Sequence, residues 1–91
     1  MEFSAVDVLD VSQAGFIAVV VTPDLPEFPP GSVHPVHVTR PDGSLLEVPA
    51  IVEYRRRPPL KPVLLRFSGL VPADIPIGST LVIDQHGRVD G

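Results

Sequence analysis

The sequence predicts a small, soluble, all-β domain, a compact barrel with almost no helix, and three observations support this prediction. Twelve prolines and seven glycines interrupt the 91 residues so often that no window suits a helix of ordinary length. Short runs rich in Val, Ile and Leu lie between these breaks, a pattern typical of strands in a sandwich or barrel. Hydrophobic residues make up 44% of the chain, which is enough for a core and argues against disorder.

We expect six strands, over residues 5–11, 16–22, 33–40, 44–54, 63–68 and 80–84, with one helical turn around 72–74. The length is that of one modest domain, so residues 1–91 are expected to form a single β-barrel with its core in about residues 5–84. A turn at His86-Gly87 is expected at the start of residues 85–91, a loose C-terminal tail.

The segment Arg40-Pro41-Asp42-Gly43 is the strongest turn signal, because Pro-Asp-Gly suits a type I turn followed by a left-handed glycine. Side chains of residues 44–54 then fall alternately on two faces, one of them mainly apolar, which is typical of a half-buried antiparallel strand. Pro49 has no N–H to donate within this strand, so it predicts an edge position or a bulge.

Residues 16–22, Phe-Ile-Ala-Val-Val-Val-Thr, are apolar on both faces of the expected strand. Such a strand needs the core on one side and, on the other, either a partner or the chain's own long loop. That proline-rich loop is expected over residues 22–32, which contain four prolines. Leu25 and Phe28 are expected to hold it across the barrel and over residues 16–21; alternatively, they are presented to a partner.

Several classes of protein are disfavoured by composition. The chain has no cysteine, which excludes disulfides and thiolate zinc sites. Its apolar runs are too short to cross a bilayer, and its first residues lack the pattern of a signal peptide, so we expect a cytoplasmic protein without membrane contact. The net charge of −4 disfavours general binding to nucleic-acid phosphates.

We expect no catalytic residue, no metal site and no cofactor. His34 and His37 are three residues apart on a strand, so they point to opposite faces and cannot both bind one metal ion. The aspartates lie mostly at turns, where carboxylates accept local backbone hydrogen bonds. No serine has the surroundings of a hydrolase nucleophile. A small hydrolase or metal-dependent enzyme is therefore the least favoured of three hypotheses.

The sharpest surface feature is basic: five of the seven cations fall within residues 55–66. The candidate binding residues are Glu53, Tyr54, Arg55, Arg56, Arg57, Lys61 and Arg66. Guanidinium groups suit phosphates, and Tyr54 offers a surface on which a base can stack, so one interpretation is nucleic-acid binding. A second is docking of an acidic protein. A third is a solvated loop whose charge is balanced by Glu47 and Glu53.

Two motifs resemble the second domain of translational GTPases of the elongation factor Tu type. They are residues 63–66, Val-Leu-Leu-Arg, and residues 74–81, Asp-Ile-Pro-Ile-Gly-Ser-Thr-Leu, which match the strand and loop that end that domain. Residues 8–22 and 51–55 look like its opening hairpin and middle strand. The resemblance covers roughly residues 6–84. It implies a stand-alone, six-stranded, antiparallel, Greek-key-like barrel.

The same resemblance implies contact with the 3′ end of tRNA, with Glu53 matching a position in that family's terminal-adenosine pocket. The sequence departs from the family at other positions. Ala14-Gly15-Phe16 stands where a Gly-Arg-Gly turn is expected, and Leu60-Lys61-Pro62 lies where an Asn is expected. No Gly-x-x-x-x-Gly-Lys-Ser/Thr phosphate loop is present. The fold therefore carries over better than the tRNA chemistry.

Our first hypothesis is a non-catalytic β-barrel module that binds a protein partner through the candidate residues above. The second is a module that binds an RNA end through Arg55, Arg56 and Arg57. A strand that is apolar on both faces, with exposed edges, also leaves a homodimer as an alternative.

Overall fold

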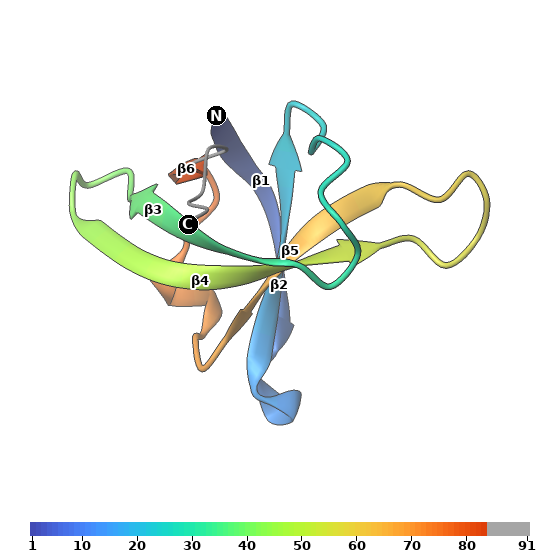
Figure 1. Cartoon of the computed structure of the whole chain (residues 1–91). Coiled ribbons are helices and arrows are strands. Elements are labelled where there is room, and N and C mark those ends of the chain that lie inside the picture. The colour runs from blue at the N-terminus through green and yellow to red at the C-terminus, as the bar shows by residue number, and fades with distance from the viewer. Residues whose placement is uncertain (84–91) are drawn as a thin grey trace, which may run out of the picture.

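The structure is a computed structural model in which residues 1–83 are described, and these residues form a closed six-stranded barrel (Figure 1). The strands are β1 (Glu2–Val11), β2 (Phe16–Thr22), β3 (Val33–Thr39), β4 (Leu45–Tyr54), β5 (Pro62–Ser68) and β6 (Thr80–Ile83). Two short 3-10 helices, η1 (Ser12–Ala14) and η2 (Pro72–Asp74), complete the described elements. The prediction of an all-β barrel with six strands is confirmed.

The strands follow one another around the barrel in the order β1-β2-β5-β4-β3-β6, and every neighbouring pair is antiparallel. β3, β4 and β5 are joined by hairpins, and β6 returns to lie beside β3, which is the Greek-key arrangement. β1 closes the barrel because it pairs with β2 on one side and with β6 on the other.

The first strand begins earlier than expected, at Glu2. Phe3 is buried, and residues 2–4 pair with β6, so the core starts before residue 5. The expected helical turn is confirmed as η2. Asp84 at the predicted end of the last strand, the His86-Gly87 turn and the tail 85–91 lie outside the described residues.

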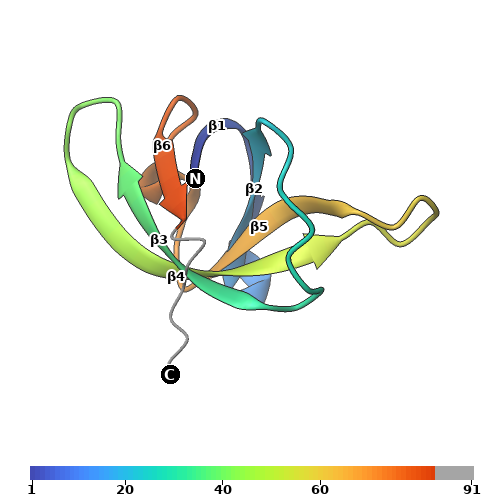
Figure 2. The ribbon, with the colours of Figure 1, turned by 45° about the horizontal axis from the view of Figure 1, so that its top comes forward.

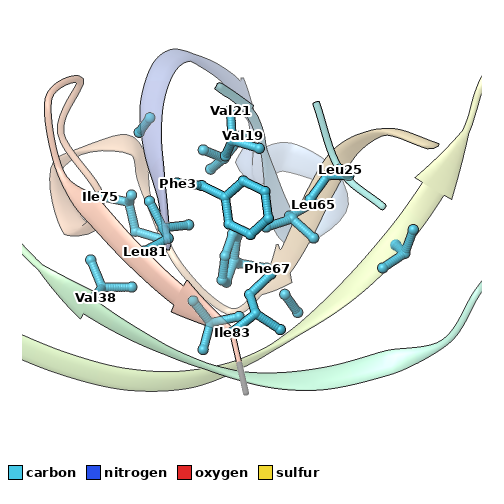
Figure 3. Close-up of a cluster of buried hydrophobic side chains, with 14 of the residues drawn as sticks. Phe3, Val19, Val21, Leu25, Val38, Leu65, Phe67, Ile75, Leu81 and Ile83 are labelled. Carbon is cyan, nitrogen blue, oxygen red and sulfur yellow. The ribbon is translucent and has the colours of Figure 1, made fainter. Parts of the chain in front are cut away.

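Alternating side chains of all six strands fill the barrel with apolar groups (Figure 3). Among those with no exposed surface are Phe67, Leu65, Ile17, Leu81 and Ile83. A bulge in β1 between Ala5 and Asp7 shifts its alternation. Burial of such side chains contributes about 1.5–3 kcal/mol each, so this cluster is the main source of stability.

The predicted turn between β3 and β4 is confirmed. Arg40 N–H donates to the Ser44 carbonyl and Gly43 N–H to the Arg40 carbonyl, each at 2.8 Å. Gly43 has a φ of +89°, the left-handed conformation that glycine adopts at little cost. Pro49 lies in the part of β4 that pairs with β3 alone, since pairing with β5 starts at Ile51, so its predicted edge position is also confirmed.

The proline-rich loop runs from the end of β2 past β5 and β4 to the start of β3 (Figure 2). Leu25 is only 8% exposed and belongs to the interior cluster, and Phe28 packs against that cluster. Backbone hydrogen bonds join Gly31 and Ser32 to Val52 of β4. Leu25 and Phe28 therefore hold the loop to the barrel, as predicted.

Candidate functional site

The connection between β4 and β5 projects from the barrel, in yellow to the right in Figures 1 and 2. We call residues 55–61 the basic arm. At its base Tyr54 pairs with Pro62, and Arg55 N–H donates to the Lys61 carbonyl at 3.1 Å. Arg55, Arg56, Arg57 and Lys61 are all exposed, and the arm contains no acidic residue.

A hollow of about 270 Å³ lies at the base of the basic arm, on the outside of the barrel. It is lined by Phe16, Ala18, Glu53, Tyr54, Arg56, Val63, Leu64 and Arg66. The hollow arises where three strands meet, because Ala18 of β2 pairs with Arg66 of β5, and β5 pairs in turn with β4. Its volume is below the 300–1,000 Å³ typical of pockets for drug-sized ligands.

Arg66 lines this hollow and makes two contacts. Its Nε lies 3.3 Å from Glu53 Oε2, and both side chains are about one-third exposed. Its Cζ lies 5.1 Å from the centre of the Phe16 ring, a cation–π arrangement. An ion pair as exposed as this contributes about 0.2–1 kcal/mol. Arg66 Nε is itself buried, and its geometry toward Glu53 falls short of a hydrogen bond within residues 1–83.

Tyr54 links the arm to the proline-rich loop, because its hydroxyl donates to the Phe28 carbonyl at 2.7 Å. The Phe28 ring in turn contacts the His34 ring, with ring centres 4.2 Å apart and the planes tilted by 41°, and Ser32 Oγ lies 2.9 Å from His34 Nε2. Burial lowers the pKa of His34 below its usual value. Tyr54 thus anchors the base of the arm, and its ring also packs against the barrel core.

The structure brings four of the seven predicted site residues together around the hollow: Glu53, Tyr54, Arg56 and Arg66. The other three, Arg55, Arg57 and Lys61, lie on the arm outside the lining. Sequence reasoning missed Phe16, Ala18, Val63 and Leu64. A signal for the first two was present, since residues 16–22 are apolar on both faces.

Phe16 and Ala18 also show what surrounds the outward face of β2. Phe16 and Ala18 line the hollow, while Leu25 of the proline-rich loop joins Val19 and Val21 inside the barrel. The prediction that the proline-rich loop covers residues 16–21 is therefore wrong for Phe16 and Ala18: Leu25 packs into the interior of the barrel, and the outward side chains at this end of β2 border the surface hollow.

The arm is exposed, as the solvated-loop interpretation expects, but neither Glu47 nor Glu53 forms an ion pair with it. Glu47 lies 3.8 Å from His37 Nε2, and Glu53 pairs with Arg66. These are the ion pairs within residues 1–83, so none of them involves the arm. The cations of the arm remain available to groups from another molecule.

Other polar side chains of the described residues serve local turns. Ser12 donates to Asp10 from its hydroxyl at 2.6 Å and its N–H at 3.0 Å, and these bonds hold the pKa of Asp10 below its usual value. Asp74 Oδ2 accepts the Val71 N–H at 2.9 Å. His34 is half-buried and His37 exposed on opposite faces of β3, as predicted. Across residues 1–83, His, Asp and Glu do not gather in threes at metal-binding distance.

The part of the chain that the structure describes has no helix with the length and apolar character needed to cross a membrane. Comparison of the chain with protein-family models, with curated proteins and with solved structures finds no match.

Proposed function

We propose that this barrel is a non-catalytic binding module that holds another protein through the basic arm and the hollow beside it. The observation that carries the proposal is the juxtaposition of four cations outside any described ion pair with an apolar floor of Phe16, Ala18 and Leu64. Protein interfaces combine a desolvated apolar centre with a charged, solvated rim in this way. The arm supplies the rim and the hollow the centre.

The charge distribution supports a partner with local negative charge. The chain carries −4 overall, yet Arg55, Arg56, Arg57 and Lys61 place +4 on the arm. Complementary charges of this kind raise association rates and select among partners more than they raise affinity. The acidic remainder of the molecule disfavours partners that are uniformly negative over a wide surface.

Binding of an RNA end is the second candidate, favoured by the resemblance to the translational GTPase barrel. Leu64, Leu65 and Arg66 of that resemblance lie in β5, and residues 74–81 run from η2 into β6, within a Greek-key barrel of six strands. We propose a relationship in fold on these grounds. Four arm cations would give single-stranded RNA a slope of about −3 for log affinity against log salt.

One capture experiment tests the proposed function. The tagged 91-residue chain and its R55A/R56A/R57A variant are incubated with extract of the source organism, with and without nuclease, and retained proteins are quantified by mass spectrometry. We expect at least one protein that the wild type retains after nuclease treatment and that the variant loses. The R55K/R56K/R57K variant is the control, because it keeps the positive charge that attracts an acidic partner and is expected to retain most of that capture.

Two outcomes would contradict the proposal. Retention that is equal for wild type and the R55A/R56A/R57A variant would show that the arm is not the binding surface. Retention that disappears on nuclease treatment, together with tRNA or oligonucleotide binding that falls steeply with salt, would favour the RNA candidate.

A further inference from the structure

Resting on the proposed function, we infer the chemistry of the segment that the partner presents. It is an extended acidic segment that inserts one apolar side chain into the hollow and places its carboxylates on the basic arm. Three properties of this surface support such a segment: the composition of the hollow, its size and the unpaired charge beside it.

The floor of the hollow is apolar and solid. Ala18 is only 5% exposed although it lies on the outward face of β2, and Phe16 and Leu64 beside it are half-buried. A hollow of about 270 Å³ is too small for a folded element and suits a single side chain. Anchors of this kind, one apolar residue in a desolvated pocket, carry much of the affinity of many protein interfaces.

The charges beside this floor define what must flank the anchor. Arg56 lines the hollow itself, Arg55 precedes it along the chain, and Arg57 and Lys61 follow it. Glu53 is occupied by Arg66, so it does not neutralise the arm. An extended segment rises about 3.3 Å per residue, so carboxylates within three positions of the anchor reach these guanidinium groups. Two or more acidic residues near the anchor therefore match the surface.

The aromatic groups of the hollow disfavour a nucleotide base as the occupant. The Arg66 guanidinium stands over the Phe16 ring, which is the face that a stacked base would use. The Tyr54 hydroxyl is bonded to the Phe28 carbonyl, and its ring packs against the core. The aliphatic groups of the lining are those of Ala18, Val63 and Leu64, and they suit contact with a side chain such as that of Leu, Ile or Phe.

Selection from a phage-displayed library of random 12-residue peptides tests this inference on the full chain. We expect enriched peptides to carry at least two Asp or Glu within three positions of a Leu, Ile, Val, Met or Phe. Enrichment of basic peptides, of acidic peptides without an apolar residue, or of none at all would overturn the inference.

The most enriched peptide is then synthesised with a fluorescent label and titrated by anisotropy against variants of the chain. Leu64→Gln removes part of the floor, and Arg56→Gln removes a flanking charge. We expect Leu64→Gln, or replacement of the peptide's apolar residue by Ser, to weaken binding at least about 10-fold. Leu45→Gln is the control for the same change of residue type. Leu45 is 75% exposed on the outward face of β4, and it lies outside the hollow.

The variants also separate this inference from the proposed function. Circular dichroism and thermal unfolding confirm that each variant is folded before it is titrated. If the Leu64→Gln and Leu45→Gln variants bound the peptide with equal affinity, the inference that an apolar side chain inserts into the hollow would be overturned. If the arm-dependent capture of a protein were still observed, the proposed function would stand without the inference about the acidic segment. Absence of that capture would contradict both the proposed function and the inference.

Discussion

The two hairpins built on β4 differ in how they use their polar groups. In the turn between β3 and β4, the polar side chains form hydrogen bonds within the fold. Arg40 Nε donates to the Asp74 carbonyl at 2.7 Å, and Asp42 accepts the hydroxyl and N–H of Ser44 at 2.6 and 2.9 Å. At the other end, the basic arm has one backbone hydrogen bond between Arg55 and Lys61, and its four cations take part in no described ion pair.

Under the proposed function, the β3–β4 hairpin stabilises the fold and the basic arm binds the partner. A polar group that is already bonded within the fold gains little from a partner, whereas an exposed cation without a neighbour gains from any carboxylate that approaches. We therefore expect substitutions in the β3–β4 turn to change stability and substitutions in the arm to change binding.

The largest effect on stability is expected for Arg40→Ala. This change removes a charged hydrogen bond to the Asp74 carbonyl and another at 3.2 Å from Nη1 to Ser44 Oγ. We expect the free energy of unfolding to fall by about 1.5–3 kcal/mol, measured by urea denaturation. Arg56→Ala is the matched control, and its expected change is within about 0.5 kcal/mol. Equal losses for the two variants would break the contrast between the hairpins.

A smaller loss is expected for Gly43→Ala in the same turn. Gly43 has a φ of +89° with nothing within 4 Å of an added Cβ, so the cost is conformational and not steric crowding from neighbours. We expect about 1–2 kcal/mol by urea denaturation. Gly43→Asn should lose less, since Asn tolerates the left-handed region better. Identical stability of wild type and Gly43→Ala would show that the turn does not hold this conformation.

The smallest expected effect is the pH dependence of stability that arises from His34, which contacts the proline-rich loop through Phe28. Burial holds the pKa of His34 below the usual value of about 6.5, so the unfolded chain takes up a proton first as the pH falls. Stability is therefore expected to be full above about pH 6.5 and to decline as the pH falls from there to the pKa of the folded state. Thermal unfolding between pH 8 and 5 measures this decline. A His34→Gln variant with the same decline would assign it to other groups.

The strands were predictable because their signals are local. Period-two alternation in residues 44–54, the Pro-Asp-Gly turn before them and the prolines of residues 22–32 each act within a few positions of the chain. The early start of β1 was missed because residues 2–4 gain their partners from β6, at the far end of the described chain. The bulge between Ala5 and Asp7 also interrupts the alternation of apolar and polar side chains from which a strand is predicted.

The candidate site was predictable only in part, for the same reason. The arm cations are consecutive in the sequence, so their clustering was visible. The hollow depends on the pairing of Ala18 with Arg66. This pairing joins two strands that are distant in the sequence, and it determines which apolar residues lie beside the arm. The partner of Glu53 likewise depends on register: Glu53 and Arg66 share the outward face of β4 and β5, and this pairing removes Glu53 from the arm.

We propose that the basic arm and the hollow form the binding surface and that the β3–β4 turn does not. The most direct test is a titration of the ¹⁵N-labelled chain with the captured partner, followed by two-dimensional NMR of its backbone amides. We expect the signals of Phe16, Arg56, Leu64 and Arg66 to shift or broaden, and those of residues 40–44 to stay in place. Shifts confined to residues 40–44, with the signals of the arm and hollow unchanged, would place the binding surface at the β3–β4 turn instead.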